Sequence, residues 1–286
     1  MTDRVAPDGR TVALTAAALV CFAANSVLCR IALRGGGIDA ASFTTIRIVS
    51  GAVVLLALAR RGGAAGAPHA GSWTTAALLA LYAVPFAFAY TRLSTGTGAL
   101  VLFGTVQTTM LAAALWSGDR PRPVQWLGIG SALTGLVTLV SPGLTAPSPT
   151  GALLMAIAGV AWAFYSLLGR RTSSPLLHTT GNFVRAVPIV GVVSLLAVAG
   201  VHAEAHGVAL AVASGAIASG LGYVAWYAVL RRISAMHAAV VQLAGPVLAA
   251  AGGVIFLAET VSLRLVASTI MVLGGIALAI LRRHAP

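Results

Sequence analysis

The sequence predicts an all-α integral membrane protein in which ten helices cross the bilayer. Of its 286 residues, 58% are apolar and only 8% are charged, whereas about a quarter of the residues of soluble domains are charged. Apolar runs recur from end to end, each close to the roughly 20 residues that a helix needs to cross the hydrocarbon core. We expect membrane spans at residues 11–33, 42–59, 73–93, 97–116, 124–141, 151–169, 176–199, 207–230, 237–257 and 264–281.

Most arginines lie at the ends of these apolar runs. All eighteen basic residues are Arg, and twelve of them fall on one side of the membrane if the N-terminus is cytoplasmic. These twelve are Arg4, Arg10, Arg60, Arg61, Arg120, Arg122, Arg170, Arg171, Arg231, Arg232, Arg282 and Arg283. Because cytoplasmic loops are enriched in basic residues, the pattern predicts that both termini are cytoplasmic. The formal net charge of +12 is therefore a topology signal, and we expect no nucleic-acid partner.

The first apolar run superficially resembles a signal peptide, because it follows a short basic segment. It is too long for that role and lacks a clear small-residue cleavage site. We therefore expect it to be retained as a membrane helix.

The two halves of the chain repeat each other at an offset of 140 residues. Residues 20–30 (VCFAANSVLCR) and residues 160–170 (VAWAFYSLLGR) share Val, Ala, Ser, Leu and Arg in register. The same offset relates Asp119 to Glu259, and the Pro- and Gly-rich stretch 141–150 has the composition of a linker. The chain therefore reads as a tandem duplication.

Each copy holds five expected spans, and this odd number predicts that the second copy enters the membrane from the opposite side. We expect two inverted five-helix repeats, at residues 1–145 and 146–286. Inverted repeats commonly bind a solute near the membrane midplane, between the two copies. Phe22 and Trp162, which correspond in the repeat, are then expected to approach one cavity from opposite leaflets. Small residues that suit close helix contact in lipid recur in the fifth span, at Gly128, Ser131 and Gly135.

On these features the sequence resembles the drug/metabolite transporter superfamily, specifically its ten-helix members built from EamA-type repeats. The resemblance rests on the five-plus-five layout and on three paired motifs. The motifs are Phe22-Ala23 with Trp162-Ala163, Arg47 with Arg185, and Asp119 with Glu259, where Asp119 stands in place of the usual Glu. It implies a bacterial-type inner-membrane protein that exports amino acids or other small metabolites by alternating access.

Aromatic side chains mark the expected solute site. Tyr82, Phe86 and Tyr90 recur every four residues and form one stripe of a helix. The fold implied by the resemblance brings this stripe together with aromatic residues of the first, sixth and eighth spans. With the polar candidates, the predicted substrate-binding set is Phe22, Asn25, Tyr82, Phe86, Gln107, Trp162, Tyr165, Tyr223, Trp226 and Gln242. Ordinary packing and interfacial anchoring remain alternatives for the aromatics, and contacts between helices for the polar residues.

Arginines and prolines inside the spans carry weaker signals. An Arg in hydrocarbon must find a partner or reach water, so Arg47 and Arg185 are expected either to contact a solute carboxylate or to cap backbone carbonyls. Pro85, Pro188 and Pro246 each remove a backbone hydrogen bond and can act as hinges, although membrane helices also tolerate proline for structural reasons alone.

Several residue types are missing from the expected spans. No Asp or Glu lies deep in a span, and proton-coupled carriers typically need such a group, so we expect uncoupled facilitated diffusion. The alternatives are a proton-coupled drug or metabolite antiporter and a channel or scaffold without transport. The chain contains no Lys, which excludes a P-loop. The cluster His202-Ala203-Glu204-Ala205-His206 has metal-binding residue types, but it lies in a short external loop with no further ligand nearby. We expect no enzyme activity, metal or cofactor. The expected partners are a small solute and the bilayer, and the sequence leaves the oligomeric state open, with a monomer as one option.

Overall fold

The computed structural model describes residues 8–63, 70–116, 123–143, 146–169, 172, 174–230, 232–233 and 241–281. Its helices are α1 (Gly9–Arg34), α2 (Ala40–Arg61), α3 (Trp73–Tyr90), α4 (Thr95–Trp116), α5 (Pro123–Val140), α6 (Pro149–Gly169), α7 (Pro175–Leu196), α8 (Ala205–Ala213), α9 (Gly222–Leu230), α11 (Ala244–Leu257) and α12 (Leu263–Leu281). A 3-10 turn, η2 (Val198–Gly200), follows α7, and a π-helical segment, η3 (Ser214–Leu221), joins α8 to α9.

The described helices include eight apolar stretches long enough to cross a membrane. One of them is the continuous stretch Ala205–Leu230, which contains α8, η3 and α9. α11 and α12 are shorter apolar helices. Large apolar side chains such as Trp116 and Leu196, which are 95% and 84% exposed, cover the outer surface. Such a surface suits contact with lipid rather than water.

Two of the predicted spans differ from the observed helices. The span expected at 207–230 contains the π-helical η3, and its backbone passes close to α2. A Cβ on Gly215 would lie 2.1 Å from the Arg47 carbonyl oxygen, so only glycine permits this approach. The span expected at 237–257 begins outside the described residues, and the helix described there is α11.

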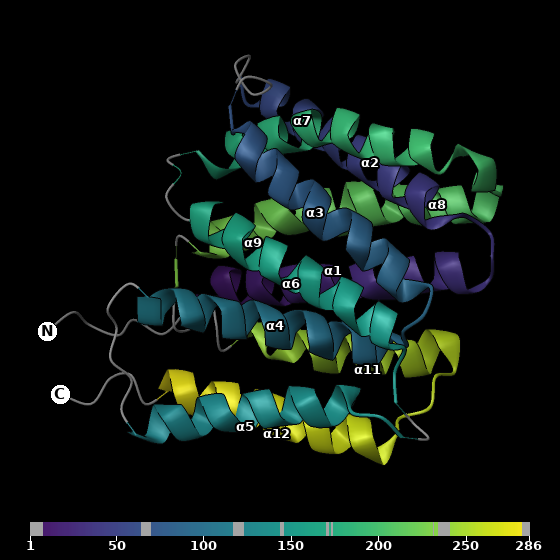
Figure 1. Ribbon diagram of the computed structural model, residues 1–286. Coiled ribbons are helices and arrows are strands. Elements are labelled where there is room, and N and C mark those ends of the chain that lie inside the picture. The colour runs from purple at the N-terminus through teal and green to yellow at the C-terminus, as the bar shows by residue number, and fades with distance from the viewer. Residues whose placement is uncertain are drawn as a thin grey trace, which may run out of the picture.

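The helices form one bundle of roughly parallel rods (Figure 1). α2 and α7 pack together at one edge, and α5 and α12 pack together at the opposite edge. Between them, α3 packs on α6 and α7, while the stretch from α8 to α9 packs on α1 and α2. α4 packs on α6, and α11 packs on α1. Exchanging α1 to α5, in order, with α6, α7, the α8–α9 stretch, α11 and α12 maps the α2–α7 and α5–α12 contacts onto themselves. The same exchange converts each of the other contacts named here into another one of them.

The edge pair of α5 and α12 confirms the predicted role of small residues in helix contact. A Cβ on Gly128 would lie 2.5 Å from the Gly275 carbonyl oxygen, and a Cβ on Gly275 would lie 2.5 Å from the Gly128 oxygen. Ser131 donates a hydrogen bond to the Met271 carbonyl at 3.0 Å, and Gly135 also abuts Met271. Close backbone contact therefore holds these two helices together.

Candidate functional site: a central aromatic cavity

A small cavity lies where α1, α3, α4, α6 and α9 meet. Its walls are Phe22, Asn25, Ser26, Tyr82, Phe86, Leu102, Phe103, Val106, Trp162 and Tyr223. The volume of this cavity is about 20 Å³. One water needs about 10–15 Å³ by this measure. A solute of amino-acid size therefore requires the aromatic side chains to move apart.

Trp162 is the centre of the aromatic wall. Its ring centroid lies 4.8 Å from Tyr82, 5.0 Å from Tyr223, 5.5 Å from Tyr165 and 6.4 Å from Phe22. These separations lie in the range of favourable aromatic pairs. Trp162 and Phe22, which correspond in the sequence repeat, thus line the same cavity.

The structure brings part of the predicted site together. Phe22, Asn25, Tyr82, Phe86, Trp162 and Tyr223 line the cavity. Tyr165 and Trp226 stand one layer behind, where they contact Trp162 and Phe22 respectively, with Trp226 at 5.6 Å from Phe22. Gln107 and Gln242 are buried but are not among the lining residues.

Sequence reasoning missed three apolar residues of α4 that line the cavity: Leu102, Phe103 and Val106. Phe103 is the lone aromatic before the end of its span, and this was the available signal for the inward face of α4. Leu102 and Val106 carried no signal, because similar aliphatic residues recur along the whole of α4.

A chain of hydrogen bonds runs along the polar side of the cavity. The Ser214 hydroxyl donates to Asn25 Oδ1 at 2.6 Å, and Asn25 Nδ2 donates to the Tyr82 hydroxyl at 3.2 Å. Arg47 Nη2 also donates to the Tyr82 hydroxyl, at 3.1 Å, and Arg47 Nε donates to the Ser219 hydroxyl at 3.1 Å. Both serines belong to η3 and were not predicted. The π-helical segment therefore supplies both ends of this chain.

The two paired arginines lie in different surroundings. Arg47 is only 1% exposed, and its guanidinium carbon lies 5.3 Å from the Tyr82 ring and 5.0 Å from the Phe86 ring. Arg185 is half-buried and donates to the backbone carbonyls of Ala70 and Gly181. Arg47 is not itself a lining residue, but it lies directly behind the lining residues Tyr82 and Phe86. The contacts of Arg185 match the carbonyl-capping alternative.

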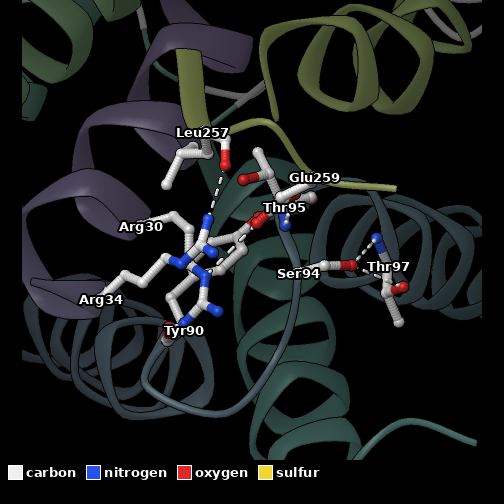
Figure 2. A network of polar contacts seen from close by, with 8 residues as sticks. All are labelled: Arg30, Arg34, Tyr90, Ser94, Thr95, Thr97, Leu257 and Glu259. Atoms are coloured by element: carbon white, nitrogen blue, oxygen red, sulfur yellow. Dashed lines mark hydrogen bonds and ion pairs between the residues drawn. The ribbon is translucent and has the colours of Figure 1, made fainter. Parts of the chain in front are cut away.

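A second polar network ties helix ends together at one side of the bundle (Figure 2). Arg30 donates to the Tyr90 carbonyl at 2.7 Å and pairs with Glu259 at 3.4 Å. The other oxygen of Glu259 accepts from the Thr95 backbone N–H at 2.8 Å, and Arg34 donates to the Leu257 carbonyl at 2.6 Å. The network joins the ends of α1, α3 and α11 to the start of α4.

The described acidic residues all lie at helix ends or in loops. Asp8 and Asp39 accept the first backbone N–H bonds of α1 and α2, Glu204 precedes α8, and Glu259 follows α11. Burial raises the pKa of Asp39, but hydrogen bonds from Ser42 and His202 outweigh it, so its pKa lies below the ordinary value. In the described part of the chain, no three metal-binding side chains gather at one place.

The three predicted hinge prolines occupy different positions. Pro85 and Pro188 lie inside α3 and α7, where each removes an intrahelical hydrogen bond. Pro246 lies in the first turn of α11, where the missing N–H has no intrahelical partner to lose.

Comparison with known proteins adds a family match. The sequence profile of the "EamA-like transporter family" matches the chain twice, over residues 9–141 and 149–281. "Uncharacterized protein PA1977" of Pseudomonas aeruginosa is 46% identical over 277 residues, which make up 97% of this chain and 96% of that protein.

Two further similarities are more limited. "Uncharacterized inner membrane transporter YedA" of Escherichia coli K12 is 31% identical over 137 residues, which cover 48% of this chain and 43% of YedA. A protein of known crystal structure matches with a TM-score of 0.67 over 93% of this chain and 98% of its own. Its sequence identity is 22%, so this likeness shows the fold alone.

Proposed function

Since this chain belongs to the EamA-like transporter family and is a multi-pass membrane transporter, we propose that it exports small metabolites through the central cavity. Amino acids with aromatic or other apolar side chains are the proposed solutes. The cavity carries the proposal, because it combines aromatic rings with a few polar groups in the middle of the bundle. Binding sites for small molecules have this composition.

Transport proceeds in this proposal by alternating access between two inverted repeats, residues 1–145 and 146–286. The exchange of helix contacts between the halves supports a pseudo-two-fold axis, and the family profile matches once in each half. In such folds one repeat moves against the other around a fixed site. Pro85 and Pro188 are proposed hinges within helices, and Pro246 is a proposed hinge at the start of α11.

The proposed location is a bacterial inner membrane, with both termini in the cytoplasm. YedA is named as an inner membrane transporter, and the distribution of Arg favours cytoplasmic termini.

Uncoupled facilitated diffusion is the proposed mode. A proton-coupled carrier needs a group that changes its charge at membrane depth. The described carboxylates instead lie at helix ends or in loops. Their positions support transport down the solute gradient.

The predicted binding residues divide into two groups in this proposal. Phe22, Asn25, Tyr82, Phe86, Trp162 and Tyr223 contact the solute directly. Tyr165, Trp226, Gln107 and Gln242 support the wall or contact the solute only after the helices move. Trp162→Ala should enlarge the cavity and shift preference from small towards large side chains by several-fold in competition assays, and an unchanged preference would argue against the aromatic site.

Counterflow of radiolabelled amino acids in proteoliposomes tests the whole proposal. Vesicles loaded with unlabelled aromatic, aliphatic or charged amino acids are assayed with no ion gradient imposed. Saturable exchange supports an uncoupled carrier and ranks its substrates. Flux that requires a proton gradient indicates an antiporter, ionic conductance indicates a channel, and neither flux nor conductance indicates a scaffold.

A further inference from the structure

Arg47 lacks a complete set of hydrogen-bond partners. A guanidinium carries five N–H donors and stays charged at all relevant pH values. The Nε and one Nη of Arg47 donate to Ser219 and Tyr82. The other nitrogen, Nη1, is fully buried and has no hydrogen-bond partner among the residues that the structure describes. A buried donor without a partner is costly, more so when it is charged.

The charge of Arg47 also lacks a counterion in the described part of the chain. The ion pairs there join Arg30 to Glu259 and Arg232 to Asp8. Arg47 has the rings of Tyr82 and Phe86 beside its guanidinium, and such contacts offset only part of the cost of burying a cation.

Tyr82 has a hydrogen to donate. Its hydroxyl oxygen accepts N–H bonds from both Arg47 and Asn25. The carbonyl oxygen of Asn25 is already bonded to Ser214. With the Asn25 amide in this orientation, the hydroxyl hydrogen of Tyr82, a cavity-lining residue, remains available. Tyr223, which also lines the cavity, adds a second buried hydroxyl, and this hydroxyl has no hydrogen-bond partner in the described part of the chain.

We propose that Arg47 and Tyr82 form an anion subsite in the cavity wall that takes the carboxylate group of the solute. The inference rests on the proposed transport function and names the chemical group that the site recognises. Tyr82 donates to the carboxylate directly. Arg47 supplies the opposite charge behind it, and its free Nη1 becomes a second donor once the rings move to admit the solute.

A carboxylate fits this position better than an amide or an amine. Charge-assisted hydrogen bonds are about twice as strong as neutral ones, and Arg matches the planar geometry of a carboxylate. An ammonium group would meet a like charge. The apolar body of the solute then lies against Trp162 and Phe86, which leaves the aromatic wall to select among side chains.

A matched ligand pair tests the subsite in the purified full chain. 3-Phenylpropionate and 3-phenylpropanamide share the same body and differ in the charged group. Ligand-dependent melting temperatures in detergent at pH 7 give both dissociation constants. We expect the carboxylate to bind at least about tenfold more tightly, since about 1.4 kcal/mol corresponds to tenfold. Equal affinity for the two ligands, or binding of neither, overturns the proposal.

Variants then assign the preference to residues. Arg47→Met should reduce the carboxylate-to-amide affinity ratio to near one, and Arg47→Lys should restore part of it. Tyr82→Phe should weaken carboxylate binding several-fold and keep a preference for charge. Arg92→Met removes an exposed charge as the matched control and should leave the ratio unchanged. An Arg47→Met protein that keeps the wild-type ratio contradicts the proposal.

The two proposals fail separately in these experiments. A carboxylate preference in binding without counterflow of any solute rejects the carrier and retains the subsite. Counterflow with equal use of carboxylate and amide solutes rejects the subsite and retains the carrier.

Discussion

Arg30 and Arg47 both lie inside apolar helices long enough to cross a membrane, yet their charges have different partners. The guanidinium of Arg30 pairs with Glu259 and donates to the Tyr90 carbonyl. Its side chain is 16% exposed and lies near the end of α1. Arg47 lies deeper in the bundle, where its guanidinium has two hydroxyl acceptors and two aromatic rings beside it. Its Nη1 has no hydrogen-bond partner within the described ranges.

The difference separates a structural arginine from one suited to binding. The partners of Arg30 belong to the protein, so this residue ties helix ends together and gains nothing from a solute. Arg47, directly behind the lining residues Tyr82 and Phe86, has no counterion among the described residues. A buried cation whose partners are incomplete is therefore the better pointer to a binding site.

The largest expected effect is on transport. Arg47→Met should lower counterflow of a carboxylate solute about tenfold or more, because a hydrogen bond to a charged group contributes about 1.5–3 kcal/mol. Arg30→Met should keep counterflow within a few-fold of the wild type. Both are measured as initial exchange rates at equal reconstituted protein. Equal losses in the two variants contradict the distinction between them.

Thermal stability should show the opposite order. Arg30→Met leaves the Glu259 carboxylate without its cation and should lower the free energy of unfolding by about 1–3 kcal/mol. Arg47→Met removes an unbalanced buried charge and should be neutral or stabilising. Melting temperatures in one detergent measure both. A larger loss in Arg47→Met than in Arg30→Met would mean that Arg47 is mainly structural.

A double substitution isolates the ion pair itself. Glu259→Gln combined with Arg30→Met should be more stable than the sum of the single losses predicts, by about 0.5–3 kcal/mol, because contacting partners are not additive. Arg47→Met with Glu259→Gln serves as the control and should be additive within about 0.5 kcal/mol. Coupling in the control pair would show that the two regions are not independent.

A smaller effect is expected at Ser219, which accepts from Arg47 Nε. Ser219→Ala leaves one more donor of the Arg47 guanidinium without a partner. It should change the affinity for a carboxylate by two- to five-fold, because a typical hydrogen bond contributes about 1 kcal/mol. Ser214→Ala acts through Asn25 and should change it less. Titration with 3-phenylpropionate measures the affinity of both variants. A larger effect of Ser214→Ala than of Ser219→Ala would contradict the assumption that Ser219, which contacts Arg47 directly, matters more than Ser214.

The smallest effect concerns Asp39, whose carboxylate is held by backbone N–H groups instead of a guanidinium. Its pKa is lowered in the folded protein relative to the ordinary 3.8. The charged form therefore stabilises the fold above pH 3.8, and this contribution is lost as pH falls through the lowered pKa. Asp39→Asn should reduce the melting temperature slightly at pH 7. The difference in melting temperature from wild type should shrink as pH falls below 3.8 and disappear below the lowered pKa. A difference that stays constant as pH falls would assign the effect to shape alone.

The cavity-lining residues that could best be predicted from the sequence are those whose residue type is rare in a membrane helix. Tyr82, Trp162 and Asn25 stand out in apolar spans, and each lines the cavity. Gln107 stands out equally but lies outside the lining, because polarity alone does not tell which way a buried side chain faces. Ser214 and Ser219 gave little signal, since small hydroxyl residues are common at ordinary helix contacts.

The sequence by itself determined that the chain is helical, multi-pass and duplicated, because span length, hydropathy and internal repetition are properties read along the chain. The tertiary structure decided which arginine is paired and which is not. Arg30 and Glu259 are 229 positions apart, and Arg47 and Ser219 are 172 apart. Such contacts depend on the rotation of each helix about its axis and on the π-helical shift in η3, which only the packing of the whole bundle fixes.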